Sequence, residues 1–214
     1  MKNAVICFTR VPRPGKTKTR LMPRLTGDQC AALHWAFLRD LSEIYQELDA
    51  DLFVAHTPDP DWEHLKAVFP AARFFPQVGD GLGAKMDNAL NAVLTLGYEK
   101  VVLTGSDLPL MTAAHLRSGF DALENADIAL GPTADGGYYL VGVKSHSPFL
   151  FENQTYGCGS VFDNTAAAAR AAGKTVAPAS PCDDVDTPED LRKLRDLPPD
   201  SHTARYLSEI GEIK

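Results

Sequence analysis

The stretch AVICFTRVPRPGKTKTRL, residues 4–21, contains the two features that decide the fold. Its first five residues, Ala4–Phe8, form a short apolar run that is typical of a buried strand. The remainder holds two prolines, a glycine and five cations, a composition that is typical of a loop. A buried strand that runs into such a loop and then into a helix is the first half of a βαβ unit. The stretch therefore predicts an α/β fold with a basic loop at the carboxyl end of a strand, where ligands of such folds bind.

The rest of the chain alternates apolar runs with helical periodicity. From Thr26, a candidate N-cap, apolar residues recur three or four apart as far as Leu48, which predicts a long amphipathic helix. Further strands are expected at 52–56, 73–78, 100–104, 128–131, 138–143 and 175–177, and further helices at 61–68, 82–96, 113–123, 161–172 and from Thr187. This order predicts a three-layer α/β/α sandwich with a mostly parallel, mixed sheet. We expect one domain over residues 1–214, with a core of about 4–194 and a polar tail on the surface.

Charge is distributed unevenly along the chain. Residues 1–24 contain seven basic side chains and no acidic one, whereas the other 190 residues contain 14 basic and 28 acidic side chains. An acidic protein with one cationic segment is a poor candidate for binding nucleic acid, which needs many distributed phosphate contacts, and a better one for holding a small polyanion. The chain has no apolar run long enough to span a membrane, and its four cysteines are far apart. We expect a cytoplasmic protein. The sequence does not indicate whether it is a monomer or an oligomer.

The basic loop is the first candidate site. If it were extended from Gly15 onward, Lys16, Lys18 and Arg20 would project from one face and could bind consecutive phosphates, while Gly15 would let the backbone approach the ligand. Gly15-Lys16-Thr17 suggests a Walker A loop. That motif is excluded because Arg10 stands where its first glycine should be. The alternative is a solvated basic loop.

Carboxylates form the second candidate site. Asp107 follows the strand at 100–104, a position from which it could coordinate Mg²⁺ (or Mn²⁺) together with substrate phosphates. Three more acids, Asp183, Asp184 and Asp186, repel one another unless a cation neutralises them. Asp184 and Asp186 would share one side of an extended segment and are candidate metal ligands. The alternatives are a turn cap at Asp107 and a solvated acidic turn.

Two glycine motifs are weaker signals. In Asp135-Gly136-Gly137-Tyr138 the glycines permit close approach of a ligand and Tyr138 could line a pocket, although a plain hairpin turn explains the motif equally well. The loop Gly79–Gly83 precedes a helix and could hold the base or ribose of a nucleotide through its backbone. The six histidines form no zinc-binding pattern, so packing or surface roles are expected for them.

Taken in order, AVICF, PGKTKTRL, GSDLP, DGGYYLVG and DVDTPEDL resemble the nucleotide-diphospho-sugar transferase superfamily with its GT-A fold. More narrowly, the chain resembles the bacterial glycosyltransferase-like, radical-SAM/selenodomain-associated transferases, which are similar to molybdenum-cofactor nucleotidyltransferases and phospholactate guanylyltransferase. The resemblance implies phosphate-binding, base- or ribose-binding, acceptor-binding and metal-binding groups. These are, in that order, Arg13, Gly15, Lys16, Lys18 and Arg20; Gln77, Gly79, Asp80, Gly83 and Lys85; Asp135, Gly136 and Gly137; and Asp107 with Asp186.

These motifs favour a Mg²⁺-dependent transferase that moves a nucleotidyl group from an NTP to a small phosphorylated or hydroxyl acceptor and releases pyrophosphate. Three or more cations in the basic loop fit a triphosphate better than a diphosphate. One alternative is a glycosyltransferase with a nucleotide-sugar donor. Another is a non-catalytic nucleotide-binding module. The sequence names neither the base nor the acceptor.

Overall fold

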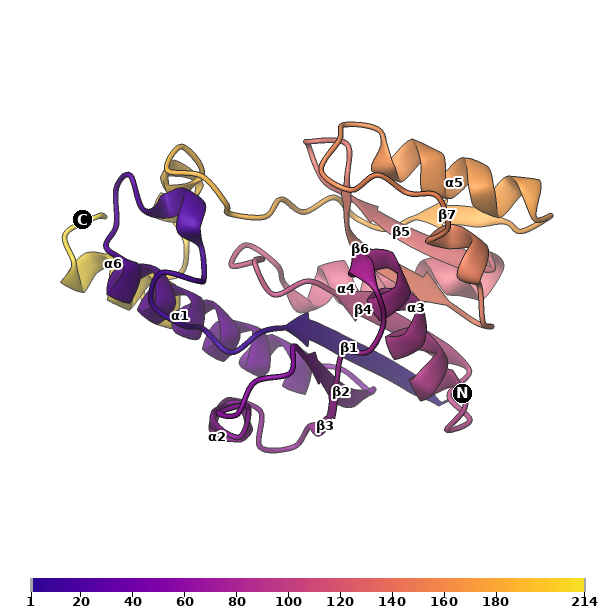
Figure 1. Cartoon of the computed structure of the whole chain (residues 1–214), viewed down its shortest axis with the longest axis horizontal. Coiled ribbons are helices and arrows are strands. Elements are labelled where there is room, and N and C mark those ends of the chain that lie inside the picture. The colour runs from indigo at the N-terminus through magenta and orange to yellow at the C-terminus, as the bar shows by residue number, and fades with distance from the viewer. Residues whose placement is uncertain (1, 214) are drawn as a thin grey trace.

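The apolar runs of the sequence pair into one mixed sheet of seven strands, in the order β3-β2-β1-β4-β6-β5-β7. The structure is a computed structural model and describes residues 2–213 (Figure 1). The strands are β1 (Asn3–Thr9), β2 (Asp51–His56), β3 (Arg73–Pro76), β4 (Lys100–Thr104), β5 (Ile128–Pro132), β6 (Tyr138–Val143) and β7 (Val176–Pro178). Only β6 runs against its neighbours, β4 and β5, and all other pairs in the described chain are parallel. The predicted mostly parallel, mixed sheet is confirmed.

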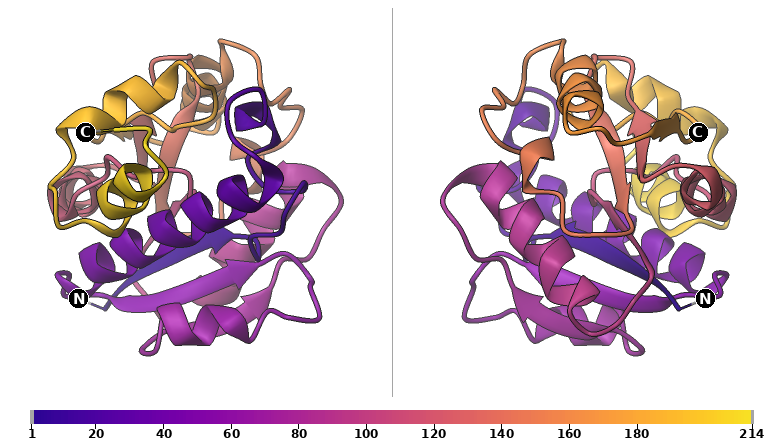
Figure 2. Two further views of the ribbon diagram at one scale, coloured as in Figure 1. Left: turned by 90° about the vertical axis from the view of Figure 1, so that its left-hand side faces the viewer. Right: turned by 90° about the vertical axis from the view of Figure 1, so that its right-hand side faces the viewer.

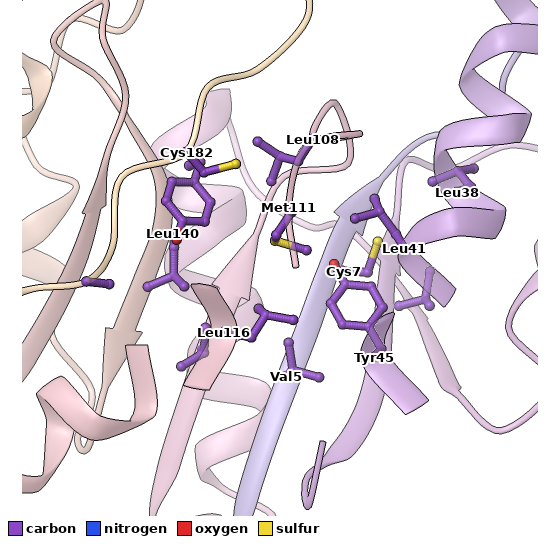
Figure 3. Close-up of a cluster of buried hydrophobic side chains, with 14 of the residues drawn as sticks. Val5, Cys7, Leu38, Leu41, Tyr45, Leu108, Met111, Leu116, Leu140 and Cys182 are labelled. Atoms are coloured by element: carbon purple, nitrogen blue, oxygen red, sulfur yellow. The ribbon is translucent and has the colours of Figure 1, made fainter. Parts of the chain in front are cut away.

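Helices cover both faces of this sheet, as the two side views show (Figure 2). The helices are α1 (Gly27–Gln46), α2 (His64–Val68), α3 (Gly81–Leu94), α4 (Ala113–Asn125), α5 (Val161–Ala171) and α6 (His202–Glu209). Alternate residues of β1 point to opposite faces, so that Val5 and Cys7 join one buried cluster while Ala4 and Ile6 join another. The first cluster packs under α1 and α4 (Figure 3), and the second packs under α3 and α5. This is the predicted three-layer α/β/α sandwich.

The start of α1 follows from the sequence. Thr26 accepts a hydrogen bond from the Gln29 backbone N–H, and the Gln29 side chain accepts one from the Thr26 N–H. This reciprocal capping box satisfies two backbone donors that the first helical turn leaves free. It also fixes where the basic loop ends and α1 begins.

The tail after Pro198 was expected only to lie on the surface, but it forms α6 and packs on α1. The reason is a polar anchor combined with apolar contact. The buried carboxylate of Asp40 on α1 accepts hydrogen bonds from the backbone N–H groups of His202 and Thr203 and from the Thr203 hydroxyl. Leu207 of α6 is buried in a third apolar cluster with Leu33 and Phe37 of α1.

Three local predictions need correction. The helix expected over 61–68 begins at His64, and the strand expected over 73–78 ends at Pro76. The helix expected from Thr187 is a 3₁₀ helix over Asp190–Asp196. Ahead of this helix, the Asp190 carboxylate accepts hydrogen bonds from the backbone N–H and the hydroxyl of Thr187, the contact that an acid three residues after an N-cap makes in a capping box. None of the helices within residues 2–213 is long and apolar enough to cross a membrane.

Candidate functional site

A pocket of about 650 Å³ lies at the carboxyl ends of β1 and β4. Its walls come from four places: the start of the basic loop, the Gly105–Leu108 segment after β4, the start of α3, and the β5–β6 turn with the loop before α5. The acidic segment 183–186 adds Asp184 and Asp186. This is the edge at which open α/β sheets bind ligands, because strands leave the sheet there and their loops are free to carry polar groups.

The basic loop is not extended, which corrects the predicted row of three cations. Lys18 has a left-handed backbone conformation with φ 52°, and Thr19–Leu21 form a 3₁₀ turn. The Lys18 side chain is thereby turned inward, where it is only 2% exposed. Its ammonium lies 2.6 Å from Asp107, 3.0 Å from Asp186 and 2.6 Å from the Val185 carbonyl oxygen. Lys18 therefore links Asp107 to Asp186 of the acidic segment, two parts of the predicted carboxylate site that are far apart in the sequence.

Asp107 is held in place by a network of buried polar groups. The backbone N–H of Val185 donates to the Asp107 carbonyl oxygen, which fixes the acidic segment beside the end of β4. Behind the carboxylate, His34 of α1 lies 3.1 Å from the Ser106 hydroxyl and 3.5 Å from Asp107. Burial alone would raise the pKa of Asp107, but the charge and hydrogen bond of Lys18, together with His34 and Arg10, outweigh that effect and hold the pKa below its ordinary value. Asp107 is therefore an anion at neutral pH.

The His34 imidazole is uncharged at neutral pH, since its burial lowers its pKa to about 4. It can contribute a hydrogen bond next to Asp107 but no charge at pH 7.

The acids of segment 183–186 have different surroundings. Asp183 accepts a hydrogen bond from the Ala134 backbone N–H and pairs with Lys193, so it ties the segment to the β5–β6 turn. Asp184 lines the pocket and has no hydrogen bond or ion pair within residues 2–213. Burial, and then the charges of Asp186 and Asp135, raise the pKa of Asp184 to about 6. The pocket therefore contains a carboxylate, Asp184, that is opposed by neighbouring acids and acted on by the Lys18 charge without a direct ion pair in the described chain.

The three carboxylates of the pocket are candidate ligands of a divalent cation, but their oxygens do not all lie within 4.8 Å of one another, and the Lys18 ammonium contacts both Asp107 and Asp186. Asp107, Asp184 and Asp186 all line one pocket and offer hard oxygen ligands, the type that Mg²⁺ and Mn²⁺ take. A cation would relieve the repulsion that raises the Asp184 pKa. Among the described residues, the group whose ligand atoms lie within 4.8 Å of one another is Asp40, Glu43 and His202, which lies between α1 and α6 and outside this pocket. Its Asp40 oxygens already hold the start of α6.

The other predicted phosphate-binding groups are divided between the pocket and its surroundings. Arg20 lines the pocket and lies 3.7 Å from Asp186. Lys16 is exposed outside it and has no acidic partner within the described residues. Arg13 is turned away and binds Asp59 and Asp61. Gly15, with φ +69°, sits in the turn that packs against Gly27.

The predicted base- and ribose-binding groups show a similar division. Gln77 and Lys85 line the pocket, whereas Gly79, Asp80 and Gly83 do not. The Gln77 amide donates to the carbonyl oxygens of Thr9 and Ala55, so it ties together the ends of β1 and β2.

The β5–β6 turn brings Asp135, Gly137 and Tyr138 to the pocket. Asp135 is exposed, and its Oδ1 accepts hydrogen bonds from the Thr133 hydroxyl and the Gly137 N–H, contacts that lower its pKa. Gly136 does not line the pocket but packs on the loop before α5, where its carbonyl oxygen accepts from the Phe162 N–H. The turn and that loop therefore form one wall.

Substituting Gly136 tests how this wall is held together. Gly136→Ala would place a Cβ 2.2 Å from the Gly159 carbonyl oxygen at a residue with φ +82°. Because the clash is with backbone and the conformation is left-handed, we expect a loss of about 2–4 kcal/mol of unfolding free energy in urea denaturation. Gly97→Ala is the matched control, since Gly97 has φ +85° and nothing within 4 Å of the added carbon. Equal losses in the two variants would mean that the wall is not locked by this contact.

Sequence reasoning missed several residues of the pocket. Arg10 is exposed, lines the pocket and has no acidic partner among residues 2–213. Ser106 and Tyr156 line it as well. Arg10 carried a usable signal, since it directly follows β1 within the acid-free segment. His34 carried none, because a single histidine in an amphipathic helix is indistinguishable from a packing residue.

Comparison with solved structures identifies the fold. A protein from Desulfovibrio desulfuricans G20, provisionally assigned as a nucleotide-diphospho-sugar transferase, is 32% identical and superposes with a TM-score of 0.90 over 100% of both chains. A cytidylyltransferase from Leptospira borgpetersenii is 14% identical, with a TM-score of 0.59 over 98% of this chain and 92% of its own. A Mycobacterium tuberculosis protein in complex with manganese is 17% identical, with a TM-score of 0.53 over 92% and 100%. No curated protein matches the chain.

The fold and the position of the pocket therefore define a member of the nucleotide-diphospho-sugar transferase superfamily. Within it, residues 40–158, more than half of the chain, match the family model described as "Uncharacterized protein conserved in bacteria (DUF2064)". The chain belongs to this DUF2064 family.

Proposed function

We propose that the chain is a nucleotidyltransferase that depends on a divalent metal and transfers a nucleotidyl group from an NTP to a small acceptor. One observation carries this proposal: cations from the basic loop and the carboxylates of Asp107, Asp184 and Asp186 meet at a single pocket. Carboxylates alone would repel a polyphosphate, and a site that bound the polyphosphate through cations alone would have no use for three carboxylates. Both together suit a polyphosphate bound with a metal ion.

In this reaction an acceptor oxygen attacks the α-phosphorus of the NTP, a new P–O bond forms, and the bond to the β-phosphate breaks so that pyrophosphate leaves. Arg10 and Arg20 line the pocket and would stabilise the charge of the departing pyrophosphate. Lys18 would hold Asp107 and Asp186 in the geometry seen here, with their negative charges directed to one place. The work is positioning and charge neutralisation, so no general base is required.

Asp107, Asp184 and Asp186 would hold Mg²⁺ or Mn²⁺, which when bound would neutralise phosphate charge and make the α-phosphorus more electrophilic. The manganese in the Mycobacterium tuberculosis relative supports a divalent ion as cofactor. The cytidylyltransferase among the structural relatives supports an NTP as donor.

A glycosyltransferase with a nucleotide-sugar donor is the second candidate. Two observations favour it: the assignment of the 32% identical relative, and the loss of the predicted three-cation row, which leaves Arg10 and Arg20 as the basic-loop side chains that line the pocket in the described chain. A diphosphate needs fewer cations than a triphosphate.

The product decides between these functions. The chain is incubated with Mg²⁺, a mixture of small hydroxyl and phosphorylated acceptors, and each NTP or nucleotide-sugar in turn. Release of pyrophosphate is the expected result. Release of a nucleoside diphosphate from a nucleotide-sugar would replace the proposal by glycosyl transfer. Nucleotide binding that yields neither product and is unchanged by Asp107→Asn would indicate a non-catalytic module.

A further inference from the structure

The acceptor side of the pocket has a chemistry of its own, which its bounding residues define. We call the β5–β6 turn and the loop before α5, residues 133–138 and 156–161, the acceptor wall. These two segments touch, since a Cβ on Gly136 would strike the Gly159 carbonyl and one on Gly159 would lie 3.4 Å from the Asp135 carbonyl. Cys158 lies on this wall and lines the pocket.

Charge on the acceptor wall is negative. Neither of its two segments contains a lysine, arginine or histidine, whereas Asp135 belongs to it and Asp184 lies close enough to feel the Asp135 charge. The cations that line the pocket come from other elements: Arg10 and Arg20 from the basic loop, and Lys85 from α3. The acceptor wall thus contributes a carboxylate and no cation of its own, and the cation whose charge acts on Asp135 is Lys193, which does not line the pocket.

Two side-chain donors of this wall are already used, since the Thr133 hydroxyl donates to Asp135 and the Cys158 thiol donates to the Thr155 carbonyl oxygen. Asp135 uses its Oδ1 within the turn, and its Oδ2 has no partner among the described residues. Tyr138 and Tyr156 line the pocket, and their hydroxyl oxygens are buried without a hydrogen-bond partner in residues 2–213. Free carboxylate oxygens beside aromatic faces suit hydroxyl or ammonium groups, which donate hydrogen bonds and can pack on rings.

We infer that the acceptor is not anionic where it meets this wall: it is a neutral polyhydroxyl compound or an amino alcohol, and not a phosphate ester or carboxylic acid. This inference rests on the proposed function, because it takes this half of the pocket as the acceptor site. A phosphate here would face Asp135 with no cationic side chain of the wall to bind it, and like charges at such distances cost binding energy.

The electrostatic potential at the acceptor wall can be measured from the rates at which charged reagents modify the Cys158 thiol. Cys7, Cys30 and Cys182 are buried, which leaves Cys158 as the partly exposed thiol of the chain. Its thiolate attacks the sulfenyl sulfur of a methanethiosulfonate reagent, forming a disulfide and releasing methanesulfinate. The rate is compared for 2-aminoethyl and 2-sulfonatoethyl methanethiosulfonate in Mg²⁺, each normalised to its rate with free 2-mercaptoethanol. The normalised ratio removes any effect of thiol ionisation.

We expect the cationic reagent to react about tenfold faster than the anionic one. Asp135→Asn should lower this ratio about two- to fivefold, while Asp121→Asn, an exposed acid on α4 outside the pocket, should leave it unchanged. Cys158→Ser should abolish labelling. A ratio of one or less would overturn the inference, because the backbone N–H groups of the 157–159 loop would then form an anion site. Labelling needs neither nucleotide nor turnover, so its outcome is independent of the product assay.

Discussion

Asp107→Asn is expected to lower metal-dependent turnover by about a thousandfold or more, while nucleotide binding falls only a few-fold. The substitution preserves shape but removes the negative charge that the proposed metal needs. Asp107 also accounts for one of the two ion pairs of buried Lys18. Turnover is measured as pyrophosphate release, and binding by calorimetry in the presence of Mg²⁺.

Asp183→Asn is the matched control for this prediction. Asp183 is an acid of the same segment that does not line the pocket, and asparagine can still accept the hydrogen bond from Ala134. We expect its turnover to remain within about threefold of the unmodified chain, in line with the small effects of surface substitutions. Comparable losses in both variants would mean that Asp107 acts through general electrostatics or folding and not as a metal ligand.

Lys18→Met is expected to lower the free energy of unfolding by about 2–3 kcal/mol. Removing one partner of a buried ion pair costs about 3–5 kcal/mol, and the cost is reduced here because Asp107 and Asp186 are 43% and 34% exposed. Millimolar Mg²⁺ should recover part of the loss, since a cation bound to the same carboxylates relieves their repulsion. Urea denaturation with and without Mg²⁺ measures both effects.

Lys16→Met controls for the loss of a positive charge from the same loop. Lys16 is exposed and has no acidic partner in the described chain, so its replacement should change stability by no more than about 0.5 kcal/mol. If the two variants were equally stable, Lys18 would not hold the two carboxylates together. If Mg²⁺ stabilised Lys18→Met no more than the unmodified chain, the carboxylates would not share a metal.

The layers of the fold were predictable because they depend on periodicity. β4 and β6 have the predicted bounds, and the capping box at Thr26 follows from the spacing of Thr26 and Gln29. The tail was not predictable, since α6 is held by the buried carboxylate of Asp40, which precedes it by more than 160 residues. Contacts of that kind leave no local pattern in a sequence.

The candidate site was predictable in its parts and not in its arrangement. The position of Asp107 after β4 could be derived from the order of elements, and Asp184 and Asp186 were recognisable as neighbouring acids that repel one another. Their meeting in one pocket depends on the Val185 N–H, which donates to the Asp107 carbonyl oxygen. The conformation of the basic loop could not be derived from the sequence. The left-handed φ of Lys18 turns one cation inward, a choice that depends on two carboxylates supplied by distant segments.

The most direct test of a metal-bound nucleotide is the melting temperature of the chain with each NTP, measured with and without Mg²⁺. A ligand that binds only the folded state raises the melting temperature by an amount that grows with the logarithm of its concentration divided by its dissociation constant. We predict that at least one NTP raises it by about 4 °C or more in Mg²⁺ and by clearly less without the metal. The same shift in both conditions, or no shift with any NTP, would contradict the account.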